Sequence, residues 1–295
     1  MLRLWSIAFI LAVITALLIP MQWLSVVLRL PTRRWIPVAY HRIVCALIGV
    51  RVRVDGARLT GQPVLLVANH TSWLDISVIT AVAPVVFVAK REVGTWPIFG
   101  LLAKLQRSVF VDRERRHKTA EVIAEIGSRV ANGDPVVLFA EGTSNDGNRV
   151  LPFRSALIGA AGQALSQTRR PEVLIQPLSI AYPAFQGIAM GRQHRPIVAW
   201  YGDIDLLPHL GAVLARGALD AVVTWGEPVT YRRDADRKAV AKTLEGAVRR
   251  LTTDVLRGRV ATIGRSEAAS EPFLFPGNPF KRRRATQPPS PKWDV

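Results

Sequence analysis

Short apolar runs bounded by turn-forming residues recur between residues 63 and 231, and amphipathic stretches separate them. The short runs are typical of strands buried in a sheet, and the amphipathic stretches are typical of helices that cover it. We expect strands at 63–68, 85–89, 108–111, 136–140, 173–181, 196–201 and 220–225, and helices at 72–82, 114–131, 155–167 and 236–257. This alternation predicts an α/β fold with a mixed, largely buried sheet flanked by helices.

Polar residues follow several of these strands directly. They are His70, Lys90, Arg113 and Glu141. In α/β folds the loops after the carboxyl ends of the strands form the binding crevice. The four positions therefore predict a functional site at that edge of the sheet.

The N-terminal segment contains 24 consecutive uncharged residues, from Trp5 to Leu28. As a helix it would be about 36 Å long, enough to cross a hydrocarbon core of about 30 Å. We expect a membrane anchor, and the alternatives are a cleaved signal peptide and an interfacial hairpin kinked at Pro20. Arginines are denser after this segment than before it, so the positive-inside rule places the following domain in the cytoplasm.

The formal net charge is +17, and residues 1–60 hold eight arginines and one aspartate. Basic residues beside an apolar anchor suit anionic lipid head groups or an acidic soluble partner. Nucleic acid is the competing partner, but the chain has no zinc-finger spacing, basic zipper or RNA-binding aromatic signature, so we expect no nucleic-acid binding. The single cysteine, Cys45, excludes an internal disulfide and a multi-cysteine zinc site.

Composition divides the chain into three parts. We expect a membrane anchor and interfacial segment at 1–50, an α/β domain at 51–264, and a basic, proline-rich tail at 265–295. The tail has six prolines and six lysines or arginines without periodic apolar positions, which is typical of disorder. Its role is either electrostatic contact with the membrane or solubility alone.

The stretch NHTSWLD, residues 69–75, places a histidine and an aspartate five positions apart, directly after a predicted strand. In one continuous helix the side chains of His70 and Asp75 would point about 140° apart. If the helix begins near Ser72 instead, Asp75 can reach back to orient one nitrogen of His70, which leaves the other free to act as a general base. Ser72 and Asp75 also fit a helix-capping pattern that needs no chemistry. These residues alone leave both interpretations open.

A second polar segment, EGTSNDGNRVLPFR, occupies residues 141–154. Its small and turn-forming residues fit an ordinary long loop. It also carries Glu141, Arg149 and Arg154 around apolar residues, and such a loop can anchor a polar head group beside an acyl chain. Arg113 lies in a charged run that equally fits the solvated start of a helix.

Five segments, in this order, resemble the successive blocks of the glycerolipid acyltransferase family, typified by lysophosphatidic acid acyltransferase. They are His70-x-x-x-x-Asp75, AKREV with WPIFG, Val109-Phe110-Val111-Asp112-Arg113, Phe139-Ala140-Glu141-Gly142-Thr143 and Gln176-Pro177-Leu178, within residues 61–232. The resemblance implies transfer of a fatty acyl group from a thioester carrier to a lysolipid hydroxyl, with His70 as general base and Asp75 as its partner. It implies no metal or redox cofactor, since the acyl donor is a co-substrate carried by acyl carrier protein or coenzyme A.

One position departs from the family pattern. The family's third block usually reads Glu-Gly-Thr-Arg, with the arginine assigned to the acceptor's phosphate, whereas this chain has Ser144 there. A serine hydroxyl does not replace an arginine fork on a phosphate dianion. The segment is more similar to the bacterial branch of the family that acylates lyso-ornithine lipid, whose head group is an amino acid.

The resemblance therefore implies O-acylation of lyso-ornithine lipid at the bacterial inner membrane, with acyl carrier protein as donor and membrane lipids as further partners. It assigns acceptor binding to Lys90, Arg113, Glu141, Gly142, Thr143, Ser144, Arg149 and Arg154. Lysophosphatidic acid is the alternative acceptor, because Arg149 can reach into the space of the missing arginine. The alternative from another class is a catalytically silent lipid-binding protein with the same fold. Oligomeric state is left open.

Overall fold

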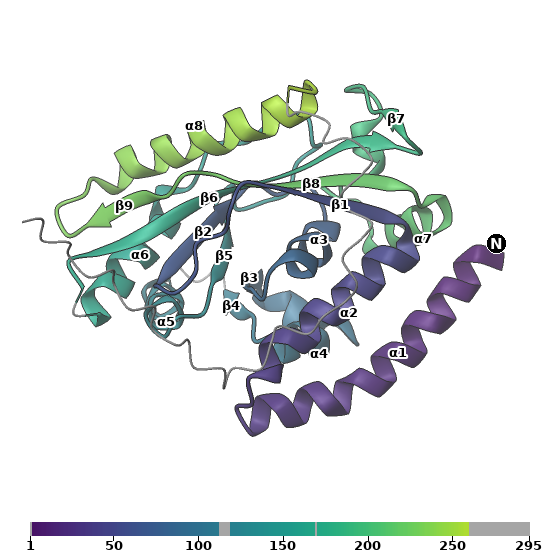
Figure 1. The fold of residues 1–295 in the computed structure, drawn as a ribbon, viewed down its shortest axis with the longest axis horizontal. Coiled ribbons are helices and arrows are strands. Elements are labelled where there is room, and N and C mark those ends of the chain that lie inside the picture. Colours follow the sequence, from purple (N-terminus) through teal and green to yellow (C-terminus); the bar gives the residue numbers. More distant parts are fainter. Residues whose placement is uncertain (1, 112–118, 169, 260–295) are drawn as a thin grey trace, which may run out of the picture. The chain divides into compact units, whose positions relative to one another are not determined.

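The computed structural model describes residues 2–111, 119–168 and 170–259 (Figure 1). The strands are β1 (Val50–Asp55), β2 (Val64–Ala68), β3 (Val86–Lys90), β4 (Val109–Val111), β5 (Val136–Phe139), β6 (Glu172–Phe185), β7 (Ile188–Ala189), β8 (Leu219–Trp225) and β9 (Val229–Arg232). The helices are α1 (Leu2–Val27), α2 (Thr32–Ile48), α3 (Leu74–Val82), α4 (Phe99–Leu105), α5 (Thr119–Ala131), α6 (Ser155–Gln167), α7 (Leu206–Arg216) and α8 (Arg237–Leu256). Short 3₁₀ helices are η1 (Arg91–Thr95) and η3 (Arg195–Ile197).

The described strands form one sheet in the order β1-β8-β6-β2-β5-β3-β4, with β7 and β9 pairing with β6 outside this path. The neighbours from β6 to β4 are parallel, whereas β8 and β9 run antiparallel to β6. The predicted α/β fold with a mixed sheet is thus confirmed. The parallel block brings the carboxyl ends of β2, β3 and β5 to one edge of the sheet.

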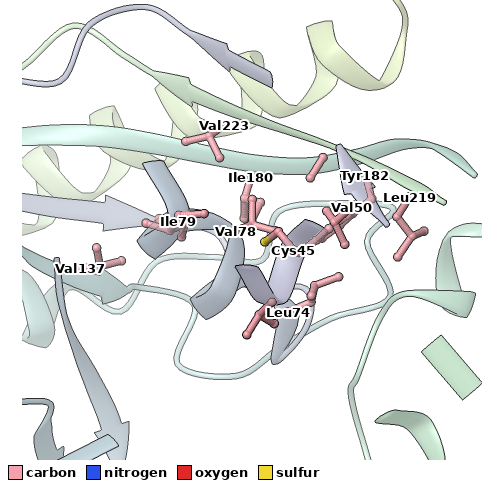
Figure 2. Close-up of a cluster of buried hydrophobic side chains, with 14 of the residues drawn as sticks. Cys45, Val50, Leu74, Val78, Ile79, Val137, Ile180, Tyr182, Leu219 and Val223 are labelled. Atoms are coloured by element: carbon pink, nitrogen blue, oxygen red, sulfur yellow. The ribbon is translucent and has the colours of Figure 1, made fainter. Parts of the chain in front are cut away.

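Helices cover both faces of the sheet. Successive side chains of a strand point to opposite faces, so one strand can contribute to both apolar clusters. On one face Leu66 and Ala68 of β2 pack in a cluster with side chains of α2 and α3, which includes the buried Cys45 (Figure 2). On the other face Leu65 and Val67 pack against apolar side chains of α5, α6 and α8. The complete burial of β2 explains why its sequence is continuously apolar instead of alternating.

One predicted strand, at 196–201, is wrong. The segment begins in the 3₁₀ helix η3, because Pro196 fits the first turn of a helix and supplies no amide to a sheet. The segment then runs over the loop after β2, where the Trp200 amide donates to the Thr71 carbonyl at 2.9 Å. Its apolar residues Val198 and Ala199 are completely buried without belonging to a strand.

The long strand β6 contains Pro177, a residue that is rare inside sheets because it lacks an amide hydrogen. Its position is where β6 exchanges antiparallel partners, after Ile175 pairs with Val229 of β9 and before Leu178 pairs with Trp225 of β8. The missing donor therefore falls at the change of partner. The neighbouring Gln176 bonds through its side chain to the backbone of Ala57, Leu59 and Gly226 and ties the start of the domain to β6.

The apolar N-terminal segment forms α1, which is long and apolar enough to cross a membrane. It continues through Pro20 as one helix, and the chain reverses only after Val27, so the alternative of a hairpin kinked at Pro20 is not formed. Both halves of α1 bond to the rest of the domain. The Arg3 guanidinium donates to the carbonyls of Ile48, Ala215 and Arg216, and the Gln22 amide donates to those of Arg33 and Leu105.

Candidate active site

The loop after β2 is held to the sheet by Asn69. Its side-chain amide donates to the Ile180 carbonyl at 2.8 Å, and its oxygen accepts from the Ile180 amide at 2.9 Å. These two bonds replace the strand ladder where β2 ends, so the chain can turn away at the next residue. His70 consequently lies on a loop between the strand and α3, as the sequence predicted for a catalytic geometry.

Asp75, in the first turn of α3, is completely buried and bonds to His70. The His70 Nδ1 atom lies 2.8 Å from Asp75 Oδ2. The same carboxylate oxygen accepts from the Thr71 amide at 2.7 Å and the Ser72 amide at 3.0 Å. Asp75 therefore accepts from two backbone amides that precede the helix and also orients the imidazole, so a structural and a catalytic role of this motif are compatible.

The other oxygen of Asp75 accepts from the Tyr182 hydroxyl at 2.7 Å. Tyr182 comes from β6, 107 positions further along the chain, and lies in the buried cluster beside α3 (Figure 2). Burial first, and the Asp75 charge second, raises the pKa of Tyr182 well above its ordinary value. The phenol therefore stays a neutral donor and fixes the rotation of the carboxylate.

An ionised carboxylate accepts hydrogen bonds only, so the Nδ1 atom of His70 carries a proton and Nε2 is the nitrogen that can take one. The imidazole stacks on Phe139 with ring centroids 4.0 Å apart and planes inclined by 15°. The His70 side chain keeps 18% of its surface exposed. The ring is thus held on one face and at one nitrogen, while solvent or substrate can reach it elsewhere.

Glu141, which follows β5, forms hydrogen bonds that hold the same loop in place. It is buried, and it accepts from the His70 amide at 3.1 Å and from the Asn145 side chain at 2.6 Å. Asn145 also donates through its side chain and its backbone amide to the His70 carbonyl. Burial raises the pKa of Glu141 to about 7, although these hydrogen bonds lower it. In this geometry Glu141 positions the histidine loop.

The remaining residues expected to bind the acceptor lie in different surroundings. Lys90 is exposed at the end of β3, and Thr143 is exposed beside the half-buried Ser144. Gly142 has φ +74°, and a Cβ atom there would lie 2.5 Å from Nε of Arg154, whose side chain passes over it. The only residue type without strain at such a position is glycine.

Arg113 lies outside the described residues. Arg149 is exposed and lines a narrow cleft together with Asn69 and Thr71, the two neighbours of His70. Arg195, from η3, lines the same cleft. In the described ranges no group of three His, Cys, Asp or Glu side chains is arranged to hold a metal ion.

Sequence reasoning missed three polar residues of the site: Asn145, Tyr182 and Arg195. Asn145 lay within a segment already singled out, but nothing in its type separates a turn former from a buried donor. Tyr182 and Arg195 reach the site only through the sheet topology and the irregular path after β6. No local spacing marks either of them.

Comparisons with known proteins concern the family and the fold. The family model described as Acyltransferase matches residues 50–181, which include His70, Asp75 and Glu141. The crystal structure of the 1-acyl-sn-glycerophosphate (LPA) acyltransferase of Thermotoga maritima superposes with a TM-score of 0.60 at 19% identity, covering 86% of this chain and 96% of that one. This structure shows that the fold is shared.

Two proteins are similar to this chain over almost their whole length. The lyso-ornithine lipid O-acyltransferase of Rhizobium meliloti (strain 1021) is 47% identical over 280 residues, which are 95% of this chain and 96% of that protein. The protein of the same description in Brucella abortus (strain 2308) is 49% identical over 257 residues, which are 87% of this chain and 96% of that one.

Proposed function

The chain belongs to the acyltransferase family, and from this premise we propose that it transfers a fatty acyl group from an acyl thioester to the hydroxyl of lyso-ornithine lipid, forming ornithine lipid. The observation that carries the choice of acceptor is the 47% identity over 280 residues to a lyso-ornithine lipid O-acyltransferase. Ser144 supports it, because no guanidinium stands there to bind a phosphate.

In the proposed reaction, Nε2 of His70 takes the proton of the acceptor hydroxyl while that oxygen attacks the thioester carbonyl. The new ester forms as the tetrahedral intermediate collapses, the carbon–sulfur bond breaks, and the proton on Nε2 passes to the leaving thiolate. Asp75 stabilises the imidazolium that exists between these steps. The motif G-x-S-x-G is absent from the sequence, so attack by the acceptor itself is preferred over a covalent serine intermediate.

Asp75 and Tyr182 serve this chemistry by restricting the imidazole. The carboxylate receives four donors: two backbone amides, the imidazole and the Tyr182 hydroxyl. Because three donors converge on Oδ2 and the phenol holds Oδ1, rotation of Asp75 would break several bonds at once. The proposed base is therefore held in one tautomer and one orientation before substrate arrives.

The apolar helix α1 associates the protein with a membrane. Its exposed side includes Trp5, Phe9, Leu17, Met21 and Trp23, which no part of the described domain covers. Because Arg3 and Gln22 attach both halves of α1 to the domain, we propose that α1 lies in the membrane interface along the domain. The arginines around it favour the anionic inner face of a bacterial inner membrane, with the domain in the cytoplasm.

For the donor we propose acyl carrier protein. The formal net charge of +17 suits a partner of acidic character, since complementary charge steers association. Comparing kcat/KM for the same acyl chain on acyl carrier protein and on coenzyme A tests this choice. A preference for coenzyme A would contradict it.

A reconstituted assay tests the function. Purified full-length protein in lipid vesicles receives equal amounts of lyso-ornithine lipid and lysophosphatidic acid, with one acyl donor, and mass spectrometry measures the two products. We expect kcat/KM to favour lyso-ornithine lipid at least about tenfold, the worth of one charge-assisted contact. A preference for lysophosphatidic acid would overturn the acceptor and leave the acyltransferase activity standing.

Membrane attachment is tested by washing isolated membranes with high salt. Salt screens the contacts of the basic residues but does not remove an inserted apolar helix. We expect the protein to remain with the membrane. Release of most of it would show that the attachment is electrostatic.

A further inference from the structure

A narrow cleft opens behind the histidine loop, and two arginines contribute to its lining. The cleft is lined by Asn69 and Thr71, by Gly147 and Arg149 of the loop after β5, and by Tyr182 and Arg195 from β6 and η3. The two residues on either side of the proposed base thus belong to it. The cleft therefore adjoins the loop that carries His70.

The path of the loop after β5 brings Arg149 to the cleft and passes close to Arg195 of η3. Gly147 has φ +74°, and a Cβ atom there would lie 3.1 Å from the Thr71 methyl group and 3.7 Å from Arg195 Cβ. The loop can therefore pass close to both residues only with a glycine at this position. The Asn148 side chain connects the loop to the segment of Arg195. Its oxygen accepts from Arg195 Nη1 at 3.3 Å, and its Nδ2 donates to the Arg192 carbonyl at 3.1 Å.

The positive charge in the cleft has no counter-charge in direct contact. Among the ion pairs of the described residues, none includes Arg149 or Arg195. The Nε atom of Arg195 is buried without a hydrogen-bond partner. Asp146 lies in the same loop and its charge acts on both arginines, but no ion pair joins it to either, and its two carboxylate oxygens accept from the backbone and side chain of Asn148. A buried guanidinium donor without an acceptor is costly, which points to an anion as the missing partner.

Burial and the neighbouring Arg192 lower the pKa of Arg195. The guanidinium nevertheless remains charged at any physiological pH. Its planar fork matches a carboxylate with two parallel hydrogen bonds. Arg149, exposed at the mouth, can supply a second cation to the same group.

The proposed acceptor carries such an anion close to its reactive hydroxyl. In lyso-ornithine lipid the hydroxyl-bearing acyl chain is joined by an amide to the amino acid, so only a few bonds separate the hydroxyl from the α-carboxylate. We propose that Arg195 and Arg149 bind the α-carboxylate of the acceptor's head group in this cleft and thereby present its hydroxyl to His70. The proposal rests on the proposed function and names the subsite that recognises the acceptor.

The test uses two acceptors that differ by one charge: lyso-ornithine lipid and its α-carboxamide, which keeps the hydroxyl acyl chain and the side-chain ammonium. We expect the wild-type enzyme to use the carboxamide with kcat/KM at least about tenfold lower. Arg195→Gln should lose a similar factor with the carboxylate acceptor, mainly through KM, and should barely distinguish the two acceptors. The KM for the acyl donor should not change.

Two control variants and one further test variant accompany Arg195→Gln. Arg192→Gln removes an exposed neighbouring charge that does not line the cleft, and it should keep the wild-type ratio between the two acceptors. Arg195→Lys keeps the charge without the fork and should fall between wild type and Arg195→Gln. Arg149→Gln should reduce the ratio on its own, so it decides the question if Arg195→Gln fails to fold.

The outcomes separate the two levels of inference. If wild type acylates lyso-ornithine lipid and Arg195→Gln keeps the full preference for the carboxylate, the cleft is not the head-group site and the proposed function stands. If wild type acylates lysophosphatidic acid and neither ornithine acceptor, the proposed function fails and the carboxylate subsite fails with it. A wild-type enzyme indifferent to the carboxamide would also overturn the subsite.

Discussion

Two histidines of this protein bond to the same helix, α3, and their surroundings differ in ways that decide what each can do. His70 bonds to Asp75, and His41 of α2 bonds to Ser77, two residues further along that helix. The second nitrogen of His41 lies 3.3 Å from the side-chain oxygen of Gln106. Both histidines are therefore held by hydrogen bonds, one of them in each case to a side chain of α3.

The two histidines differ in the charge of their hydrogen-bond partners and in whether one ring nitrogen is left without a partner among the described residues. Ser77 and Gln106 are neutral, so a neutral imidazole satisfies both: Nδ1 accepts from the serine hydroxyl, and Nε2 donates to the amide oxygen. Burial lowers the pKa of His41 to about 4, which keeps it uncharged near neutral pH. His70 has a carboxylate to stabilise its charged form, and no residue of the described chain bonds to its Nε2. Of these two histidines, His70 is the one that combines both features, and both favour action as a base.

The largest effect on turnover should come from His70→Ala. Loss of a general base typically costs on the order of a hundredfold to ten-thousandfold in rate, and we expect acyl transfer to fall to background. The variant should keep its fold and membrane attachment, as circular dichroism and membrane fractionation can check. Near-normal transfer by the purified variant would remove the difference between the two histidines.

Asp75→Asn should have the next largest effect. The amide cannot stabilise an imidazolium, and it can turn its own donor towards His70, which would favour the wrong tautomer. We expect kcat to fall about a hundredfold or more, with little change in KM for either substrate. A matched change at the other histidine, Ser77→Ala, should leave kcat near wild type. Equal losses in the two variants would contradict the assigned roles.

Tyr182→Phe should lower kcat less, by about three- to tenfold, the worth of one hydrogen bond of roughly 1 kcal/mol. The phenyl ring keeps the packing in the cluster of Figure 2, so the loss of stability should be limited to the buried Asp75 oxygen left without its donor, about 1 to 3 kcal/mol. Without the phenol donor, Asp75 attracts the imidazolium more strongly, and the acidic limb of the kcat/KM profile should move to higher pH. An unchanged profile would mean that Tyr182 serves packing alone.

The parts of the molecule that sequence could predict are those set by local pattern. The strands of the parallel block and the helices α3, α6 and α8 follow from apolar runs, periodicity and capping residues. The His70 and Asp75 pair spans five positions, so one strand end and one helix start suffice to bring it together. By contrast, β1 was missed, because the predicted strands were recognised as continuous apolar runs, whereas its sequence VRVRVD alternates apolar and charged residues, the pattern of a half-buried edge strand.

Long-range partners could not be predicted in the same way. Tyr182 reaches Asp75 because β6 lies beside β2, and no spacing in the sequence encodes that neighbour. Glu141 was expected to bind a head group, but it contacts the backbone of His70 within the protein. Its position after a strand was predicted correctly, and the sequence did not reveal this internal partner. The roles of the site residues stay predictions until variants are measured.

Glu141→Gln should affect turnover only a few-fold and should show itself in the pH dependence of stability. The pKa of Glu141 is raised from 4.5 to about 7 in the folded protein, so the protonated form is favoured there. Its contribution is fully present below pH 4.5 and is lost as pH rises through about 7. Between pH 5 and 8 the wild-type free energy of unfolding should fall by roughly 3 kcal/mol more than that of Glu141→Gln. Parallel curves from denaturation in detergent would contradict this.

His41→Gln should have the smallest effect on turnover and an opposite signature in stability. Because burial lowers the pKa of His41 from 6.5 to about 4, the folded protein favours the neutral ring. The resulting stability is present above pH 6.5 and is lost as pH falls towards 4, where the unfolded chain gains a proton that the folded chain resists. Wild type should lose roughly 2 to 3 kcal/mol over that range beyond any loss in His41→Gln. At pH 7.5 kcat per folded molecule should match wild type, since neither nitrogen of this ring is free to accept a proton from substrate. A large fall in kcat without loss of stability would show that His41 takes part in catalysis, and the division between the two histidines would then be wrong.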